Sequence, residues 1–144
     1  MNSCQTCVVD ANIAVWTVLP DPYGWGKARI RRIMQGEIIV PDLWVYEVTS
    51  VLYRYAHSQP GGEAWLKRTL PPLLALADET IHPDPEMALV AALWAKRLGQ
   101  GTVYDAFYLA LAERLGVEFW TGDKRLANRA RQVGADFVRV PGEG

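Results

Sequence analysis

The sequence predicts an α/β fold with three layers, in which helices cover both faces of a mostly parallel sheet of about five short strands. Short runs of apolar, often β-branched residues alternate along the chain with longer stretches whose apolar residues recur at helical spacing. This alternation is typical of parallel strands joined by crossover helices. The chain contains no repeat, low-complexity tract or linker, so residues 1–144 are expected to form a single domain.

Two strands and two short helices are expected in the first forty residues. The runs CVVDA and EIIVP predict buried strands, and Pro41 closes the second. A helical pattern that begins at Asn12 is broken by PDPYG. The next helix is expected to cover residues 23–35 and to end at Gly36 as its C-terminal cap.

Two longer helices are expected next. Asp42 is expected to cap a helix over residues 43–58, which QPGG stops. Residues 63–77 are also helical in composition, but Pro71 and Pro72 predict a kink or a split there.

The second half of the chain repeats the alternation of strands and helices. Asp84 or Pro85 is expected to begin one helix, which ends at Gly99, and Thr102 is expected to cap another, which ends before Gly116. The elements expected after residue 78 are a weak strand at 79–83, helices at 85–99 and 102–116, a strand at 117–122, a helix at 123–134 and a strand at 136–140.

Charge and composition exclude several kinds of protein. The formal net charge is -1, so attraction for an anionic polymer would have to come from local patches. The apolar runs are too short for a membrane span, and no signal-peptide pattern is present, so a cytoplasmic location is expected. Cys4 and Cys7 form a CQTC motif, but Cys7 begins a strand rather than opening a helix, so we expect a core cysteine and no redox centre.

Four acidic residues lie where the predicted fold would bring them together. Asp10 ends the first strand and Asp123 follows EFWTG, so both are expected at the carboxyl edge of the sheet, where open α/β folds bind ligands. Glu47 adjoins an apolar stripe on its helix. Asp105 lies in the first turn of a helix that is apolar nearly all round, so it is expected to face a cleft.

Each acid alone has a structural explanation. Asp10 and Asp123 fit helix N-caps, Asp105 fits the positive end of a helix dipole, and Glu47 fits a helix surface. Together, however, four anions in one cleft repel one another, and a divalent cation resolves this conflict. Oxygen ligands without clustered His or Cys favour Mg²⁺ or Mn²⁺, as one ion or two, and such ions promote phosphodiester cleavage.

The segments CVVDANIAVW, VPDLWVYEVTSVLYR, TVYDAFYLALAERLG and FWTGDKRLA resemble PIN-domain ribonucleases, and in particular the VapC toxins of toxin–antitoxin pairs. The four segments occur in the family's order and at its spacing, over nearly the whole chain. The resemblance implies an Mg²⁺- or Mn²⁺-dependent endoribonuclease, a hydrolase whose target is often a structured RNA such as tRNA. It also implies a homodimer inhibited by a small, VapB-like antitoxin. The implied catalytic and metal-binding residues are Asp10, Glu47, Asp105 and Asp123, with Asn12 and Thr121 as supporting residues.

Basic residues near the acids are candidate RNA contacts. Lys124, Arg125 and Arg129 follow Asp123 directly, and Arg54 lies two turns after Glu47 on the same helix face. The alternative is that these residues form solvated helix faces. No aromatic pair at the spacing of a base-stacking platform is visible, so the RNA target stays undetermined.

The aromatic residues of the helices exceed what a small core needs to bury. Some are expected at a subunit interface or in an antitoxin groove, while the alternative is ordinary core packing. The residues concerned are Trp44, Tyr53, Tyr55, Trp65 and Trp94.

Two other functions remain open at this point. Asp10 could be the nucleophile of a phosphoaspartyl phosphatase or receiver domain, but Asn12 stands where haloacid-type phosphatases have Asp, and Glu47 would have no role. A catalytically silent module that binds RNA or a protein partner would keep the fold without needing the complete set of acids.

Overall fold

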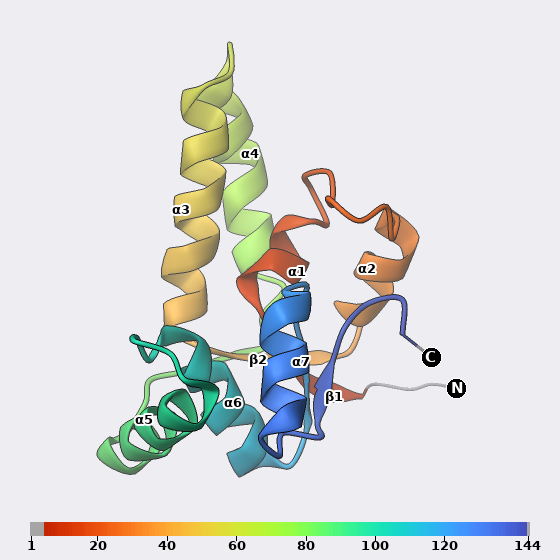
Figure 1. Ribbon diagram of the computed structural model, residues 1–144. Helices are drawn as coiled ribbons and strands as arrows, with labels where there is room; N and C mark the ends of the chain where they lie inside the picture. Colours follow the sequence, from red (N-terminus) through yellow and green to blue (C-terminus); the bar gives the residue numbers. More distant parts are fainter. Residues whose placement is uncertain (1–4, 144) are drawn as a thin grey trace.

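Five parallel strands form the central sheet, in the order β3-β2-β1-β4-β5. The computed structural model describes residues 5–143, so Cys4 of the CQTC motif lies outside the described residues. The sheet order and the flanking helices confirm the predicted three-layer fold (Figure 1). The strands are β1 (Thr6–Val9), β2 (Glu37–Pro41), β3 (Glu79–Ile81), β4 (Glu118–Trp120) and β5 (Val138–Arg139).

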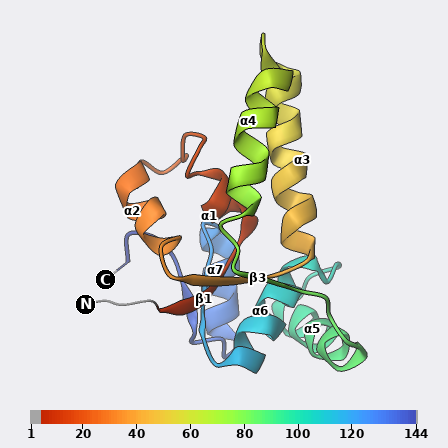
Figure 2. The same ribbon diagram turned by 180° about the vertical axis from the view of Figure 1, so that it is seen from behind.

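Helices connect the strands and flank the sheet. α3 and α4 form a helical pair that projects away from the sheet, and α5 packs against α6 near the base of α3 (Figures 1 and 2). α7 lies in front of β1 in Figure 1 and behind it in Figure 2, so it covers one face of the sheet. The helices are α1 (Ala11–Val15), α2 (Lys27–Ile33), α3 (Leu43–His57), α4 (Gly62–Leu74), α5 (Pro85–Leu98), α6 (Tyr104–Leu115) and α7 (Lys124–Gln132).

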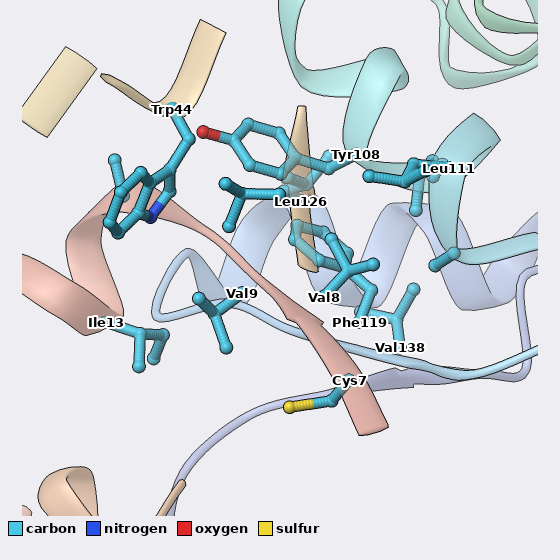
Figure 3. Packing of buried hydrophobic residues seen from close by; sticks show 14 of the residues in the cluster. Cys7, Val8, Val9, Ile13, Trp44, Tyr108, Leu111, Phe119, Leu126 and Val138 are labelled. Carbon is cyan, nitrogen blue, oxygen red and sulfur yellow. The ribbon is translucent and has the colours of Figure 1, made fainter. Parts of the chain in front are cut away.

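The core lies between the sheet and these helices (Figure 3). Val8 and Val9 of β1 are fully buried, as expected for a central strand of a parallel sheet that is covered on both faces. Cys7 is also buried as a free thiol, which confirms the expected core position. Burial, with a smaller effect of Glu118, raises the pKa of the Cys7 thiol to about 12, so this thiol is not a reactive thiolate.

The segment before α2 differs from the prediction, because the expected helix over residues 23–35 begins four residues later, at Lys27. The Asp21 carboxylate accepts hydrogen bonds from the backbone N–H groups of Tyr23 and Trp25, at 3.0 and 2.9 Å. These bonds hold the segment in a non-helical turn, in which an Asp side chain replaces helical backbone partners. The helix also ends earlier than expected, at Ile33.

Gly36 is therefore not the C-terminal cap of α2, since Met34 takes that position. Gly36 instead lies against the chain just before β1. A Cβ atom there would be 2.2 Å from the carbonyl oxygen of Gln5, so only glycine allows this close approach of two backbones.

α4 is a single helix that runs through Pro71 and Pro72, so the expected split is wrong. The two prolines remove hydrogen bonds to the carbonyl groups of Lys67 and Arg68. Both of these residues are exposed, so water can donate hydrogen bonds to their carbonyl oxygens. The helix ends two residues after the prolines, at Leu74.

Two of the expected helix caps are also wrong. Asp42 occupies the N-cap position of α3, but its carboxylate contacts His82 at 2.8 Å and caps no backbone group. The N-cap of α6 is Val103 rather than Thr102. The cap at Asp84 is confirmed, because its side chain accepts a hydrogen bond from the N–H of Met87 at 2.8 Å.

Unlike the cap expected at Gly36, the two glycine caps expected in the second half of the chain are confirmed. Gly99 and Gly116 end α5 and α6 in the left-handed conformation that glycine favours. No helix within residues 5–143 is both long enough and apolar enough to cross a membrane.

Candidate functional site

The carboxyl ends of β1 and β4 lie side by side and hold the first part of the candidate site. The N–H of Asp10 donates to the carbonyl of Trp120 at 2.9 Å, which ties the end of β1 to β4. The Thr121 hydroxyl donates to Asp10 Oδ2 at 2.8 Å. Asp10 is only 8% exposed and Thr121 is fully buried, so the sheet fixes this carboxylate in a largely water-free position.

Asn12 and Asp123 are tied to the same point. The amide group of Asn12 lies 3.5 Å from Asp10 Oδ2, and its oxygen accepts the N–H of Gly122 at 2.9 Å. The N–H of Asp123 donates to the Thr121 hydroxyl at 3.0 Å. The chain before α7 is thereby held against the start of α1.

The two helix N-cap explanations have different outcomes. Asp123 Oδ1 accepts the N–H of Leu126 at 3.0 Å, so Asp123 does cap α7. Asp10 occupies the N-cap position of α1, but its side chain caps no backbone group. Helix capping therefore does not account for the buried carboxylate of Asp10.

Glu47 and Asp105 reach the site from α3 and α6. The Tyr108 hydroxyl donates to Glu47 Oε1 at 2.5 Å, and the Gln100 amide donates to Asp105 Oδ2 at 3.3 Å. Tyr108 is fully buried, and its ring stacks on Phe119 of β4. These bonds orient two carboxylates that are both half-buried.

Tyr108 and Gln100 were not predicted as site residues. Tyr108 follows Asp105 by three residues on α6, so helical spacing places both on one face and could have found it. Gln100 lies between α5 and α6, where no periodic pattern fixes a direction. Its Oε1 atom is buried and has no hydrogen-bond partner among the described residues, so an unpaired acceptor lies beside Asp105.

Electrostatic effects link Asp10, Glu47 and Asp105 to one another. Burial raises the pKa of Asp10 from 3.8 to about 7; the Thr121 hydrogen bond opposes this, and the charges of Glu47 and Asp105 add to it. Burial and then the Asp105 charge raise the pKa of Glu47, against the effect of its hydrogen bond to Tyr108.

Asp105 links this group to the last acid. Burial raises the pKa of Asp105, its hydrogen bond to Gln100 lowers it, and the charge of Asp123 raises it further. No ion pair among the described residues includes any of the four predicted acids. The site is therefore a group of carboxylates that repel one another and have no basic partner.

The donor chemistry of this group suits a hard divalent cation. All four predicted side chains offer carboxylate oxygens, and the unpaired Gln100 oxygen lies beside one of them. Within residues 5–143, however, no three His, Cys, Asp or Glu side chains already surround a common ion position. The charges of these acids affect one another, but their side chains are not yet arranged around a single ion.

Two predicted RNA contacts have protein partners in the structure. Arg129 donates to the carbonyl groups of Leu98 and Arg97 at the end of α5, both at 3.3 Å. Arg54 is exposed and donates to Ser50 Oγ at 3.4 Å, two turns along α3 from Glu47. Arg129 thus has a structural role in holding α7 to α5.

The other two predicted RNA contacts are exposed. Arg125 is exposed at the start of α7. The Lys124 ammonium lies 4.3 Å from the centre of the Tyr23 ring and 5.6 Å from that of Trp25. The Tyr23 and Trp25 rings are 4.7 Å apart with their planes tilted by 35°, a pairing that the sequence pattern did not single out.

The helical aromatic residues divide between core and surface. Trp44 and Trp94 are buried, which fits core packing. Tyr53 and Tyr55 are exposed, and the Tyr55 ring lies 4.9 Å from that of the half-buried Trp65. Of these five residues, Tyr53, Tyr55 and Trp65 are therefore the ones that a partner could reach.

Comparison with known proteins identifies the family. The PIN domain family model matches residues 7–132. A VapC ribonuclease of Mycobacterium bovis is 35% identical over 121 residues, which are 84% of this chain and 88% of that protein.

Solved structures show the same fold at lower identity. PAE2754 from Pyrobaculum aerophilum aligns with a TM-score of 0.65 and 22% identity, over 95% of this chain and 90% of its own. A chain of a toxin–antitoxin complex from Klebsiella pneumoniae aligns with a TM-score of 0.65 and 17% identity, over 96% of this chain and 99% of its own. Since the family model spans most of the chain and the Mycobacterium bovis relative shares the same region, the protein belongs to the PIN-domain family, among its VapC-like members.

Proposed function

We propose that this protein is a metal-dependent endoribonuclease that cleaves RNA phosphodiester bonds and acts as the toxin of a toxin–antitoxin pair. One observation carries the proposal: buried Asp10 interacts with Glu47 and Asp105 at the carboxyl edge of the sheet, where no basic side chain among the described residues pairs with them. A bound cation would offset the repulsion among these anions.

The four acids would hold one or two Mg²⁺ or Mn²⁺ ions. When bound, such an ion supplies positive charge for the attacking water and for the leaving oxygen of the phosphodiester. The protein supplies the orientation of its oxygen atoms. Asp10 is held in place by the Thr121 hydroxyl and by burial at the end of β1, which restricts the positions that its carboxylate oxygens can take.

Tyr108 and Gln100 act as positioning residues in this proposal. The Tyr108 hydroxyl occupies one lone pair of Glu47, and the Gln100 amide occupies one of Asp105. Each bond restricts rotation of a carboxylate and so lowers the conformational cost of holding an ion. Asp123 is exposed and keeps one oxygen free of its helix cap, so it can join the other acids from the α7 side.

The comparisons support the substrate and the partner. The ribonuclease name of the Mycobacterium bovis relative supports RNA as the substrate. The similarity to a chain of the Klebsiella pneumoniae toxin–antitoxin complex supports a VapB-like antitoxin as the partner. We extend the proposal to a homodimer and to a structured RNA target such as tRNA, as the family resemblance implies.

The test is cleavage of RNA by purified variants. Asp10→Asn and Asp105→Asn are expected to abolish cleavage and keep the fold. EDTA is expected to stop the wild-type reaction, and added Mg²⁺ or Mn²⁺ to restore it. Asp136→Asn is the matched control, because it changes an exposed acid of the loop before β5. Full activity of either site variant, or activity that persists in EDTA, would refute the metal-dependent mechanism.

A further inference from the structure

An aromatic cluster lies in the segment that was expected to be helical. The Trp16 ring meets the Tyr23 ring edge-on at 6.1 Å and lies 5.7 Å from the Trp25 ring. The Asp21 carboxylate holds the backbone of this segment through the N–H groups of Tyr23, Trp25 and Gly26. The three rings are therefore fixed by local hydrogen bonds and by one another.

This cluster adjoins the candidate site through the turn between β4 and α7. Gly122 lies directly under Trp16: a Cβ atom there would be 2.0 Å from the Trp16 ring. The N–H of the same glycine donates to Asn12, and Thr121 and Asp123 flank it in the chain. The turn between β4 and α7 therefore positions Asp123 of the acid group and also packs against the Trp16 ring of the aromatic cluster.

A lysine ammonium group, which a ligand could displace, lies over the cluster. The Lys124 ammonium lies over the Tyr23 ring at 4.3 Å, and both residues are exposed. An exposed ammonium–ring contact is weaker than the stacking of a nucleobase on an aromatic ring. A base can therefore displace the ammonium from the ring face, which frees this flexible side chain to bind a phosphate.

We propose that Tyr23 and Trp25 form a stacking platform for an unpaired nucleobase of the RNA, with Lys124 as the contact to its phosphate. The inference rests on the proposed nuclease function and adds a binding site for the RNA strand outside the four acids. Any base can stack on such rings, so the platform positions the strand without reading its sequence.

The surroundings favour RNA over a protein partner at this place. Tyr23 is 47% exposed, its neighbour Lys124 is basic and exposed, and exposed Arg125 follows Lys124 in the chain. Aromatic anchors of protein interfaces typically fill desolvated pockets with apolar surroundings. An exposed ring with cations beside it matches the combination of base stacking and phosphate attraction that single-stranded nucleic acids use.

The test measures binding without cleavage. A labelled single-stranded RNA of about 12 nucleotides is titrated in EDTA with wild type, Tyr23→Ala and Tyr23→Phe, and with Tyr53→Ala as a control for loss of an exposed tyrosine on α3. A second oligonucleotide of equal length has its bases removed and its phosphates kept. Tyr23→Ala is expected to bind the complete RNA roughly 5- to 150-fold more weakly, whereas Tyr23→Phe and Tyr53→Ala bind like wild type.

The oligonucleotide without bases separates stacking from charge. It should bind wild type and Tyr23→Ala equally, while Lys124→Gln should weaken the binding of both oligonucleotides. Equal affinity of Tyr23→Ala and wild type for the complete RNA would overturn the platform, even where metal-dependent cleavage is established. Failure of the nuclease test leaves this binding result interpretable, because no cleavage is measured. Unchanged RNA binding with weaker binding of a cognate antitoxin would assign the rings to a protein partner and overturn the proposal.

Discussion

Replacing Asp10 with asparagine is predicted to stabilise the metal-free protein above neutral pH, although the same change is expected to abolish cleavage. The pKa of Asp10 rises from 3.8 to about 7 on folding, chiefly because the carboxyl group is buried. The protonated form is therefore the one that folding favours. The stability that Asp10 contributes is fully present below about pH 4 and is lost as the pH rises through about 7.

The size of the effect follows from the same two pKa values. At 1.36 kcal/mol per pH unit, the interval from 3.8 to about 7 corresponds to about 4 kcal/mol lost at pH 8. Asparagine carries no charge, and its amide oxygen can still accept the hydrogen bond of Thr121. Its buried NH₂ group, however, costs about 1–3 kcal/mol if it finds no partner. The net gain expected for Asp10→Asn at pH 8 is therefore about 1–3 kcal/mol.

The assay is urea unfolding in EDTA at pH 5 and pH 8. The free energy of unfolding of Asp10→Asn, relative to wild type, should increase between these two values, whereas Asp136→Asn should show no such change. Added Mg²⁺ should stabilise wild type in proportion to its binding and leave Asp10→Asn nearly unchanged. A variant that is less stable than wild type at pH 8, with no dependence on pH, would refute the argument from burial.

Two further predictions concern the positioning residues and the fold. Tyr108→Phe removes the hydroxyl that donates a hydrogen bond to Glu47 at 2.5 Å. Cleavage by this variant should therefore need roughly 10- to 100-fold more Mg²⁺, as measured by metal titration of the initial rate. An unchanged metal requirement would show that this bond does not orient Glu47. Gly62→Ala places a Cβ atom 1.8 Å from the carbonyl oxygen of Ala56 and should lower the free energy of unfolding by about 1–3 kcal/mol, while Gly101→Ala, which meets no atom within 4 Å, should have little effect in the same urea assay.

The fold was predictable because its signals are local. Each apolar run that predicted a strand contains a strand, and the sheet is parallel throughout. The errors occur where a side chain or a solvated backbone competes with the pattern. Asp21 captures backbone N–H groups and delays α2, Asp42 turns toward His82, and α4 continues through Pro71 because the carbonyl groups that lose their partners face water.

The candidate site was predictable to a different degree. Asp10 and Asp123 stand at strand ends, so topology alone places them at one edge of the sheet. Glu47 and Asp105 could be proposed from their position beside apolar helix faces. The partners that orient them depend on how α3 meets α6, which no local pattern encodes, and the aromatic pair depends on the turn built by Asp21.

The turn between β4 and α7 gives a physical reason why binding of RNA and binding of metal should be coupled. In this turn the N–H of Gly122 donates to Asn12 and the Thr121 hydroxyl donates to Asp10. The Trp16 ring packs directly against Gly122. Because no three acids already surround a common position among residues 5–143, binding of an ion by the proposed site would require some movement. Movement of the backbone at Asp10 and Asp123 would then also move the support of the aromatic rings. An RNA strand that stacks on Tyr23 and braces this turn should thus favour the arrangement that binds the ion, and by linkage the ion should favour the RNA to the same degree.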